Sequence, residues 1–309
     1  MADLRALVAD ELGRPVDPAV KELATKVADR FGPASLAVLF YGSCLRAHSV
    51  DGLMLDFYVV VDDYALAYGR GVRGRFLAWA NRLLPPNVFQ IAVAGQRAKY
   101  AVLSLADLGR LASTATRNPS VWARFAQPSR IVWALDAAAW QATVEAVAQS
   151  APTLLAAAVP LSGRTSTLRD LWTGVFAQTY ATELRSERVG RGLTLFDSDP
   201  DWYRAITAPA LAAAGVAARI DGDAVHFEDV ADVAGAARQW RRRRIEGKLL
   251  SAARLIKAST TFDGGLDYLA WKITRHSGVI VTVAPWQRRF PLLGALVLLP
   301  RLLARGAVR

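Results

Sequence analysis

Apolar residues are arranged in two ways along the first 140 residues: they recur at helical spacing in some segments and form short continuous runs in others. Apolar residues from Val20 to Phe31 recur every three or four positions, which predicts a helix over residues 18–31 that ends at Gly32-Pro33. A second helix is expected over residues 74–84. β-branched and aromatic runs predict five strands, over residues 36–41, 53–61, 88–93, 99–103 and 129–134. Strands separated by helices indicate an α/β or α+β domain.

The pattern becomes mostly helical after residue 136. Ala-rich sequence over residues 137–159 and amphipathic stretches over 167–187 and 209–216 predict helices, and residues 218–227 predict a hairpin. We therefore expect an α+β protein in which a mixed sheet with helices is followed by a mostly helical domain. The expected boundaries are residues 1–140 for the first domain, 141–235 for the second and 236–309 for a C-terminal segment.

Charge is distributed unevenly along the chain. Residues 236–309 carry a net charge of +12, whereas residues 1–235 carry −1 and the whole chain carries +11. The same segment contains a basic amphipathic stretch and ends with the apolar residues 290–300, which are too short to span a bilayer, since a helix needs about 20 residues for that. The charge points to an anionic partner, either a membrane surface or nucleic acid, and the apolar end favours the membrane surface. The alternative is a solvated basic face.

Composition limits the possible chemistry. The chain is 53% hydrophobic, which excludes wholesale disorder. Cys44 is the single cysteine, so a disulfide framework and a cysteine-based zinc site are excluded, and a reducing location is the default. The three histidines, His48, His226 and His276, show no metal-ligand spacing.

One motif carries candidate chemistry. Tyr41-Gly42-Ser43 ends a predicted strand, and the next strand carries one carboxylate, Asp56, in its first half. This order resembles the nucleotidyltransferases of the DNA polymerase β-like superfamily. A glycine allows the backbone to approach a triphosphate and a serine adds a hydroxyl donor, while a strand carboxylate suits Mg²⁺.

A second metal ligand is not obvious beside Asp56. The positions that flank it on the same strand face are Met54 and Tyr58, neither of which binds magnesium. Asp62 would lie roughly 20 Å away along a regular strand. The second ligand must therefore come from Asp51 or from another segment. By itself the motif is also compatible with an ordinary strand–loop–strand edge.

Several segments around this motif resemble one family. The chain reads Tyr41-Gly42-Ser43-Cys44, then Met54-Leu55-Asp56-Phe57, then Asp62-Asp63. Further similar segments follow in the same order: Asn87–Phe89, Lys99–Ser104, Arg124–Pro128 and Tyr180–Arg185. Together they resemble the mitochondrial-type phosphatidate cytidylyltransferases, also called translocator assembly and maintenance proteins. The chain departs from that family at Cys44, where the family has glycine, and at Glu183, where it has aspartate.

The resemblance implies an activity and its partners. It implies that CTP and phosphatidic acid give CDP-diacylglycerol and pyrophosphate with Mg²⁺ as cofactor. It also implies a nucleotidyltransferase domain followed by a winged-helix-like domain. We expect peripheral attachment to the cytoplasmic side of a membrane through residues 236–309, and no nucleic acid as partner.

The same resemblance assigns expected roles to individual residues. Asp56 is the expected metal ligand and catalytic carboxylate. Lys99 is expected to neutralise triphosphate charge. Glu183 is expected to act in catalysis as the missing metal ligand, or else to pair with Arg185 or Arg188. The expected phosphate and nucleotide contacts are Tyr41, Gly42, Ser43, Lys99, Tyr180 and Arg185.

Two other functions fit the same sequence. A non-catalytic protein that binds membrane or nucleic acid through a degenerate nucleotidyltransferase fold would explain the single strand carboxylate and the basic C-terminal segment. A nucleotidyltransferase that acts on RNA or on a small soluble alcohol is the third possibility. Dependence of binding on anionic vesicles, or a steep salt dependence of RNA binding, separates these functions.

Overall fold

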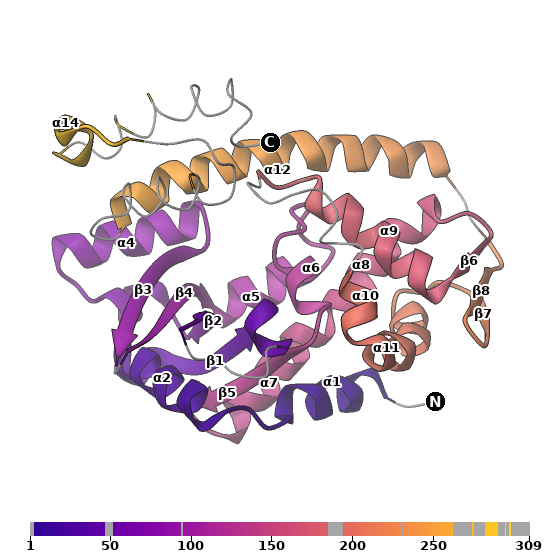
Figure 1. Ribbon diagram of the computed structural model, residues 1–309, viewed down its shortest axis with the longest axis horizontal. Coiled ribbons are helices and arrows are strands. Elements are labelled where there is room, and N and C mark those ends of the chain that lie inside the picture. Colours follow the sequence, from indigo (N-terminus) through magenta and orange to yellow (C-terminus); the bar gives the residue numbers. More distant parts are fainter. Residues whose placement is uncertain are drawn as a thin grey trace.

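The computed structural model describes residues 3–46, 52–93, 95–184, 194–229, 232–261 and 282–289, together with the single positions 274, 294 and 297. It is built around one five-stranded sheet with helices on both faces, a helical region beside it, and a long C-terminal helix that crosses both (Figure 1).

The central sheet contains all five strands that the sequence predicts. They are β1 (Ser35–Tyr41), β2 (Met54–Val61), β3 (Asn87–Val93), β4 (Gln96–Ser104) and β5 (Ser129–Ala134). Their order is β3-β4-β2-β1-β5, with β2 and β4 parallel and the other neighbouring pairs antiparallel. The sheet is therefore mixed, and the expected α+β class is confirmed.

The two faces of the sheet pack against different helices. Val38 and Phe40 of β1 point into one apolar cluster, whereas Leu39 and Tyr41 point to the other, as the alternation of a strand requires. The first cluster is covered by α2 (Pro18–Asp29), α3 (Tyr64–Tyr68) and α4 (Val72–Leu83). The second is covered by α1 (Leu4–Gly13), α5 (Leu105–Ala112), α6 (Trp122–Phe125), α7 (Ala137–Ala148) and α8 (Ser150–Ala158).

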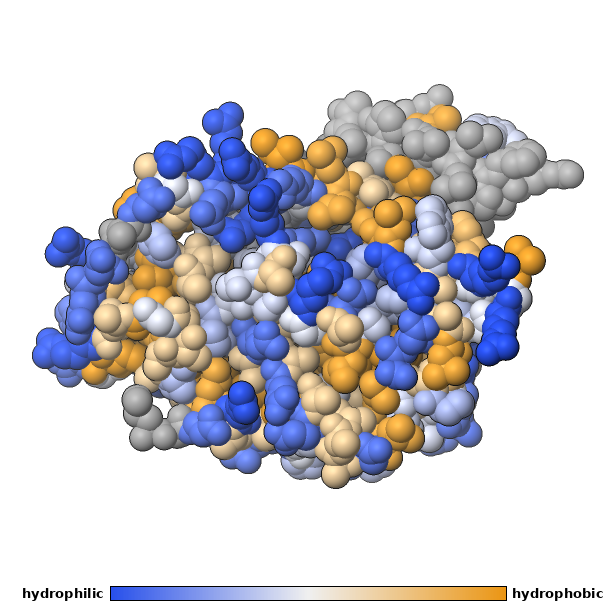
Figure 2. All heavy atoms as spheres, turned by 180° about the vertical axis from the view of Figure 1, so that it is seen from behind, coloured by the Kyte–Doolittle hydropathy of each residue, from blue (hydrophilic) through white to orange (hydrophobic). Residues whose placement is uncertain are grey.

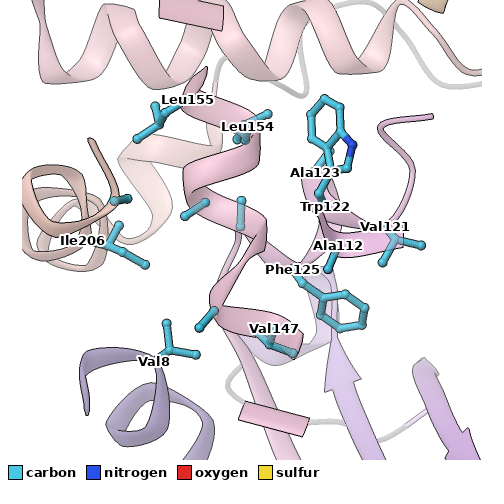
Figure 3. Packing of buried hydrophobic residues seen from close by; sticks show 14 of the residues in the cluster. Val8, Ala112, Val121, Trp122, Ala123, Phe125, Val147, Leu154, Leu155 and Ile206 are labelled. Carbon is cyan, nitrogen blue, oxygen red and sulfur yellow. The ribbon is translucent and has the colours of Figure 1, made fainter. Parts of the chain in front are cut away.

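The second cluster continues without interruption into the helical region. Figure 3 shows side chains of α1, α6, α7, α8 and α11 converging, among them Val8, Trp122, Leu154 and Ile206. The stretch Ala137–Leu161 is long and apolar enough to cross a membrane, but 61% of its apolar window is buried inside the protein, so it serves as a core element. Because the core is shared, the domain boundaries at 140 and 235 stay a prediction.

The helical region also holds a small sheet. Its elements are β6 (Thr165–Thr167), α9 (Leu168–Tyr180), α10 (Leu195–Ser198), α11 (Pro200–Ala213), β7 (Ala218–Asp221) and β8 (Ala224–Phe227), with antiparallel order β6-β8-β7. Helices beside a three-stranded sheet fit the expected winged-helix-like arrangement. Helix α11 begins nine residues earlier than expected, because Asp199 caps it and Pro200 occupies its first position. Short 3₁₀ turns complete the chain: η1 (Gly32–Ala34), η2 (Ser43–Arg46) and η3 (Val159–Leu161).

The long helix α12 (Val233–Thr261) runs from β8 across to α4, and α14 (Pro285–Arg289) follows it (Figure 1). One face of α12 is packed on the protein. Trp240 is completely buried and its Nε1–H donates to the carbonyl of Ala157 at 2.8 Å. Gly247 lies so close to Thr182 that a Cβ there would meet the Thr182 carbonyl oxygen at 2.4 Å.

Candidate functional site

A row of polar side chains crosses one face of the central sheet. Tyr41 of β1 lies opposite Asp56 of β2, Asp56 lies opposite Lys99 of β4, and Lys99 lies opposite Gln90 of β3. Residues at paired positions of neighbouring strands point to the same face of a sheet. The pairing of the strands therefore brings together three residues that the sequence selected separately, and it adds Gln90 to them.

Asp56 and Lys99 form an ion pair at the centre of this row. Lys99 Nζ lies 3.0 Å from Asp56 Oδ1, and both side chains are partly exposed. The other carboxylate oxygen faces the loop after β1, because a Cβ built on Gly42 would lie 3.4 Å from Asp56 Oδ2. The carboxylate is thus shared between a cation on one side and a glycine backbone on the other.

The loop after β1 has a shape that requires glycine. Gly42 has φ +92°, a backbone conformation that other residues rarely adopt, and Ser43 follows it as the first residue of η2. Cys44 is buried, and its Sγ lies 3.2 Å from the carbonyl oxygen of Met54 at the start of β2. Cys44 therefore holds the loop against β2.

An arginine lies over the aromatic residues next to Asp56. The guanidinium of Arg124 on α6 lies 5.5 Å from the ring centre of Tyr41 and 5.9 Å from that of Tyr58. Burial lowers the pKa of Arg124, but the nearby Tyr58, Tyr41, Glu183 and Asp56 outweigh that effect and raise it. Burial, followed by the charge of Asp56, raises the pKa of Tyr41. Arg124 is therefore a permanent cation, and Tyr41 keeps its phenolic proton.

The end of α9 brings a second carboxylate toward this cation. Glu183 Oε1 lies 3.8 Å from Arg124 Nη2, and the Glu183 amide donates to the carbonyl of Tyr180 at 3.2 Å. Tyr180 packs on the main apolar cluster at the end of α9. Of the two roles expected for Glu183, the structure shows the pairing with an arginine, although the partner is Arg124. Arg185 and Asp51 lie outside the described residues.

Helix α12 supplies further cations that the motifs did not indicate. Arg254 donates from Nη1 to Ser120 Oγ at 3.2 Å, and Arg124 donates to the main-chain carbonyl of the same Ser120. Burial lowers the pKa of Arg254, while Tyr58 raises it and Arg124 lowers it further. Arg254 therefore lies in the electrostatic reach of the Tyr58–Arg124 group, although it stands far from these residues in the sequence.

Sequence reasoning missed Gln90 as well as Arg254. The Nε2 of Gln90 is buried and has no hydrogen-bond partner among the described residues. The alternation of β3 and its antiparallel pairing with β4 would have placed Gln90 beside Lys99. For Arg254 the only sequence signal was its place in a basic amphipathic stretch, which carries no information about the residues it contacts.

The donor set can be compared with the needs of magnesium. Within the described part of the chain, no three His, Cys, Asp or Glu side chains gather closely enough to form a metal site of their own. Mg²⁺ commonly binds through one or two carboxylates, with substrate phosphates and water completing its shell. Asp56, with one oxygen turned to the Gly42 loop, fits such a shared site, and it does not fit an ion held by protein alone.

Comparison with known proteins adds little to this geometry. No protein-family model and no curated protein matches the sequence. Among solved structures, a nucleotidyltransferase-like protein from Exiguobacterium sibiricum 255-15 is similar at 11% identity and a TM-score of 0.26, over 78% of this chain and 80% of that one. A TM-score of this size does not establish a shared fold.

Proposed function

We propose that the protein is a magnesium-dependent nucleotidyltransferase, and that it transfers CMP from CTP to phosphatidic acid at a membrane surface. The observation that carries the proposal is the juxtaposition of three groups: Gly42 with its positive φ, the Asp56 carboxylate beside it, and Lys99 at 3.0 Å from that carboxylate. Nucleotidyl transfer needs an anion-binding backbone turn, a metal carboxylate and a cation at one place. Phosphatidate and CTP come from the family resemblance.

Four residues of the site have defined tasks in this reaction. The amide groups of Gly42 and Ser43 and the Ser43 hydroxyl bind triphosphate oxygens. Asp56 would hold Mg²⁺, which would supply positive charge to the phosphates. Lys99 neutralises Asp56 in the structure. In the proposed reaction it shares its charge with the triphosphate. An oxygen of the acceptor phosphate attacks the α-phosphorus, the bond to the β-phosphate oxygen breaks, and pyrophosphate leaves.

The acceptor phosphate has two candidate ligands, both of which contact Ser120. Arg124 and Arg254 both contact Ser120, and Glu183 is the carboxylate that Arg124 pairs with there. Two guanidinium groups next to one carboxylate leave positive charge, which suits a phosphate monoester. Replacing Arg254 by Lys keeps the charge but removes the planar pair of donors, so we expect a higher half-saturating phosphatidate concentration and an unchanged one for CTP.

A second function is favoured by the isolation of Asp56. Because its own strand offers no second carboxylate and Lys99 already neutralises it, the row is also compatible with a non-catalytic protein that binds anionic surfaces. Such a protein would keep the ion pair as part of its fold. It would bind vesicles without turning over any nucleotide.

Pyrophosphate release decides between the two functions. The assay measures release from each of the four nucleoside triphosphates with Mg²⁺, with and without phosphatidate vesicles, for the wild type, Asp56→Asn and Asp62→Asn. Asp62 is the matched control because it is exposed just past the end of the same strand. We expect lipid-dependent release with CTP, a loss of about 100-fold or more in Asp56→Asn, and wild-type rates in Asp62→Asn. Absence of release with every nucleotide would refute the catalytic proposal.

A further inference from the structure

Helix α4 has its large apolar side chains on the outside. The residues that it buries are small or polar: Gly74, Ala78, Ala80 and Asn81. A helix that only covers a core turns its bulky residues inward, since burial of apolar surface stabilises the fold. The arrangement in α4 is the reverse, so its outer face needs an explanation of its own.

The exposed residues form one continuous line. Val72 is 88% exposed, Phe76 47%, Trp79 59% and Leu83 69%, and their spacing of four, three and four residues places them on one side of the helix. The rings of Phe76 and Trp79 lie 6.1 Å apart. Figure 2 shows hydrophobic side chains mixed with hydrophilic ones on the face turned away from Figure 1, as is ordinary for a folded protein. We call the four residues of α4 the apolar stripe.

Positive charge surrounds the apolar stripe. The sequence from Tyr64 to Leu84 contains four arginines, at positions 70, 73, 75 and 82, and no acidic residue. Arg82 pairs with Asp63 at 2.9 Å. Across the described residues, no carboxylate lies within ion-pair distance of Arg70, Arg73 or Arg75, all of which are exposed. The helix thus presents apolar side chains with unneutralised cations around them.

We propose that the apolar stripe of α4 inserts into the interfacial layer of an anionic lipid membrane, with the surrounding arginines on lipid phosphates. Aromatic and aliphatic residues on one face and arginines beside them form the pattern of an interfacial helix, and tryptophan is favoured at that depth. A second copy of the chain fits less well. A two-fold contact through the same surface would bring the arginines of both copies together.

The position of α4 connects the membrane surface with the candidate site. The link from α4 to β3 is Leu84-Pro85-Pro86, and β3 carries Gln90 in the polar row. Arg254 donates to the carbonyl of Pro85 at 3.0 Å, and Lys257 donates to the carbonyls of Leu84 and Pro86. A membrane bound at the apolar stripe would therefore lie near the end of α12 that borders the site. Vesicle binding needs no catalysis, so this proposal and the proposed function fail separately.

Flotation of the full chain with vesicles tests the proposal. Vesicles of phosphatidylcholine alone are compared with vesicles that contain phosphatidylglycerol, for the wild type, for the double variant Phe76→Ser with Trp79→Ser, and for Leu135→Ser. Leu135 is the control because it is exposed outside α4, next to the end of β5. We expect binding to the anionic vesicles, a loss of about tenfold or more in the double variant, and wild-type binding in Leu135→Ser.

Two further measurements keep the result unambiguous. Brominated lipids should quench part of the tryptophan fluorescence of the wild type, and Trp79→Phe should lose that part. The double variant should keep the wild-type melting temperature, because its replaced side chains are exposed. Unchanged vesicle binding in the double variant overturns the proposal. A melting temperature several degrees lower in the double variant would overturn it as well, since the stripe would then be packed against the protein itself. A change from dimer in the wild type to monomer in the double variant, seen in sedimentation, would also overturn it, because the stripe would then contact a second copy of the chain.

Discussion

Helices α4 and α12 are both rich in arginine, yet they use their two faces in opposite ways. Helix α12 buries Trp240 and leaves arginines on its outer side. Helix α4 buries small residues and leaves Phe76 and Trp79 outside. The contrast shows that basic charge alone does not identify a membrane-binding helix. Two of the cations of α12, Arg254 and Lys257, hold the link between α4 and β3.

The difference between the two helices bears on which part of the chain contacts the membrane. The sequence placed membrane attachment in residues 236–309 because the positive charge is concentrated there. The first part of that segment, α12, is attached to the protein along its inner face, and its exposed face carries cations together with Ile245 and Leu249. Attachment through this segment stays a prediction. The apolar stripe of α4 adds a second candidate surface that charge counting did not reveal.

Replacing Trp240 and Trp79 by alanine, each in its own variant, tests the difference between the two helices most sharply. Trp240→Ala should destabilise the protein by about 3–5 kcal/mol, because it leaves a cavity beside Trp122 and removes a hydrogen bond to Ala157. Trp79→Ala should change stability by no more than about 0.5 kcal/mol, since the side chain is exposed. Urea unfolding of both variants gives the two values. Similar losses in the two would contradict the contrast between the helices.

A glycine exchange tests the close contact of α12 with the end of α9. Gly247→Ala should cost about 1–3 kcal/mol, because the new methyl group collides with the backbone of Thr182 and pushes the helix outward. Gly109→Ala in α5 is the control, since nothing lies within 4 Å of its added Cβ. The control should be neutral or slightly stabilising. Thermal unfolding measures both, and a neutral Gly247→Ala would show that α12 is not packed at that position.

The titration of Lys257 should make the stability of the protein depend on pH. Burial, followed by the charge of Arg254, lowers the pKa of Lys257 to about 7. In the unfolded chain the pKa returns to its ordinary value of about 10.4, so between these two values the unfolded state binds more protons and stability rises with pH. Below about pH 7 Lys257 is protonated in both the folded and the unfolded state. The folded state then carries the full cost of burying the charge, and the gain in stability seen at higher pH is lost.

Lys257→Met removes this titration. The free energy of unfolding of the wild type should rise by up to about 1.4 kcal/mol per pH unit between pH 7.5 and 9 relative to the variant, measured by urea unfolding at each pH. Parallel curves for the two proteins would show that Lys257 is not buried against the link between α4 and β3.

The smallest expected effect concerns the outer face of α12. Arg241 and Arg242 are exposed, so replacing both by Gln should weaken binding to anionic vesicles by no more than about 1 kcal/mol in total, and by less at high salt. Loss of the apolar stripe of α4 should weaken binding more, and the loss should persist at high salt. Flotation at two salt concentrations separates the two contributions. If replacing the two arginines weakens binding more than loss of the apolar stripe does, α12 and not α4 makes the main membrane contact.

The sequence was sufficient for the sheet but not for the packing of the long helix. The strands were predictable because β1 and β2 are buried on both faces, so each of them reads as a short run of apolar residues. The inner face of α12 was not, because its contacts join residues far apart in the chain: Trp240 meets Ala157, and Lys257 meets Pro86. Helix α1 was missed, although Glu11 in it pairs with the buried Arg130 of β5.

The residues of the candidate site also separate into some that the sequence predicts and others that it does not. Tyr41, Gly42, Asp56 and Lys99 were selected from local motifs, and the register of three neighbouring strands brings them together. Arg254 was not selected, because only the tertiary structure brings α12 to Ser120. Residues on adjacent strands can thus be predicted from spacing, whereas a residue delivered by a distant helix cannot.

The most direct test of the proposed transfer follows the label of CTP. The protein is incubated with Mg²⁺, phosphatidate vesicles and CTP labelled either at the α- or at the γ-phosphate, and the lipid is then extracted. The account predicts that α-label moves into the lipid phase, that γ-label stays in water as pyrophosphate, and that Asp56→Asn abolishes both changes. If neither label leaves CTP, or if the γ-label enters the lipid, the protein is not a nucleotidyltransferase acting on phosphatidate.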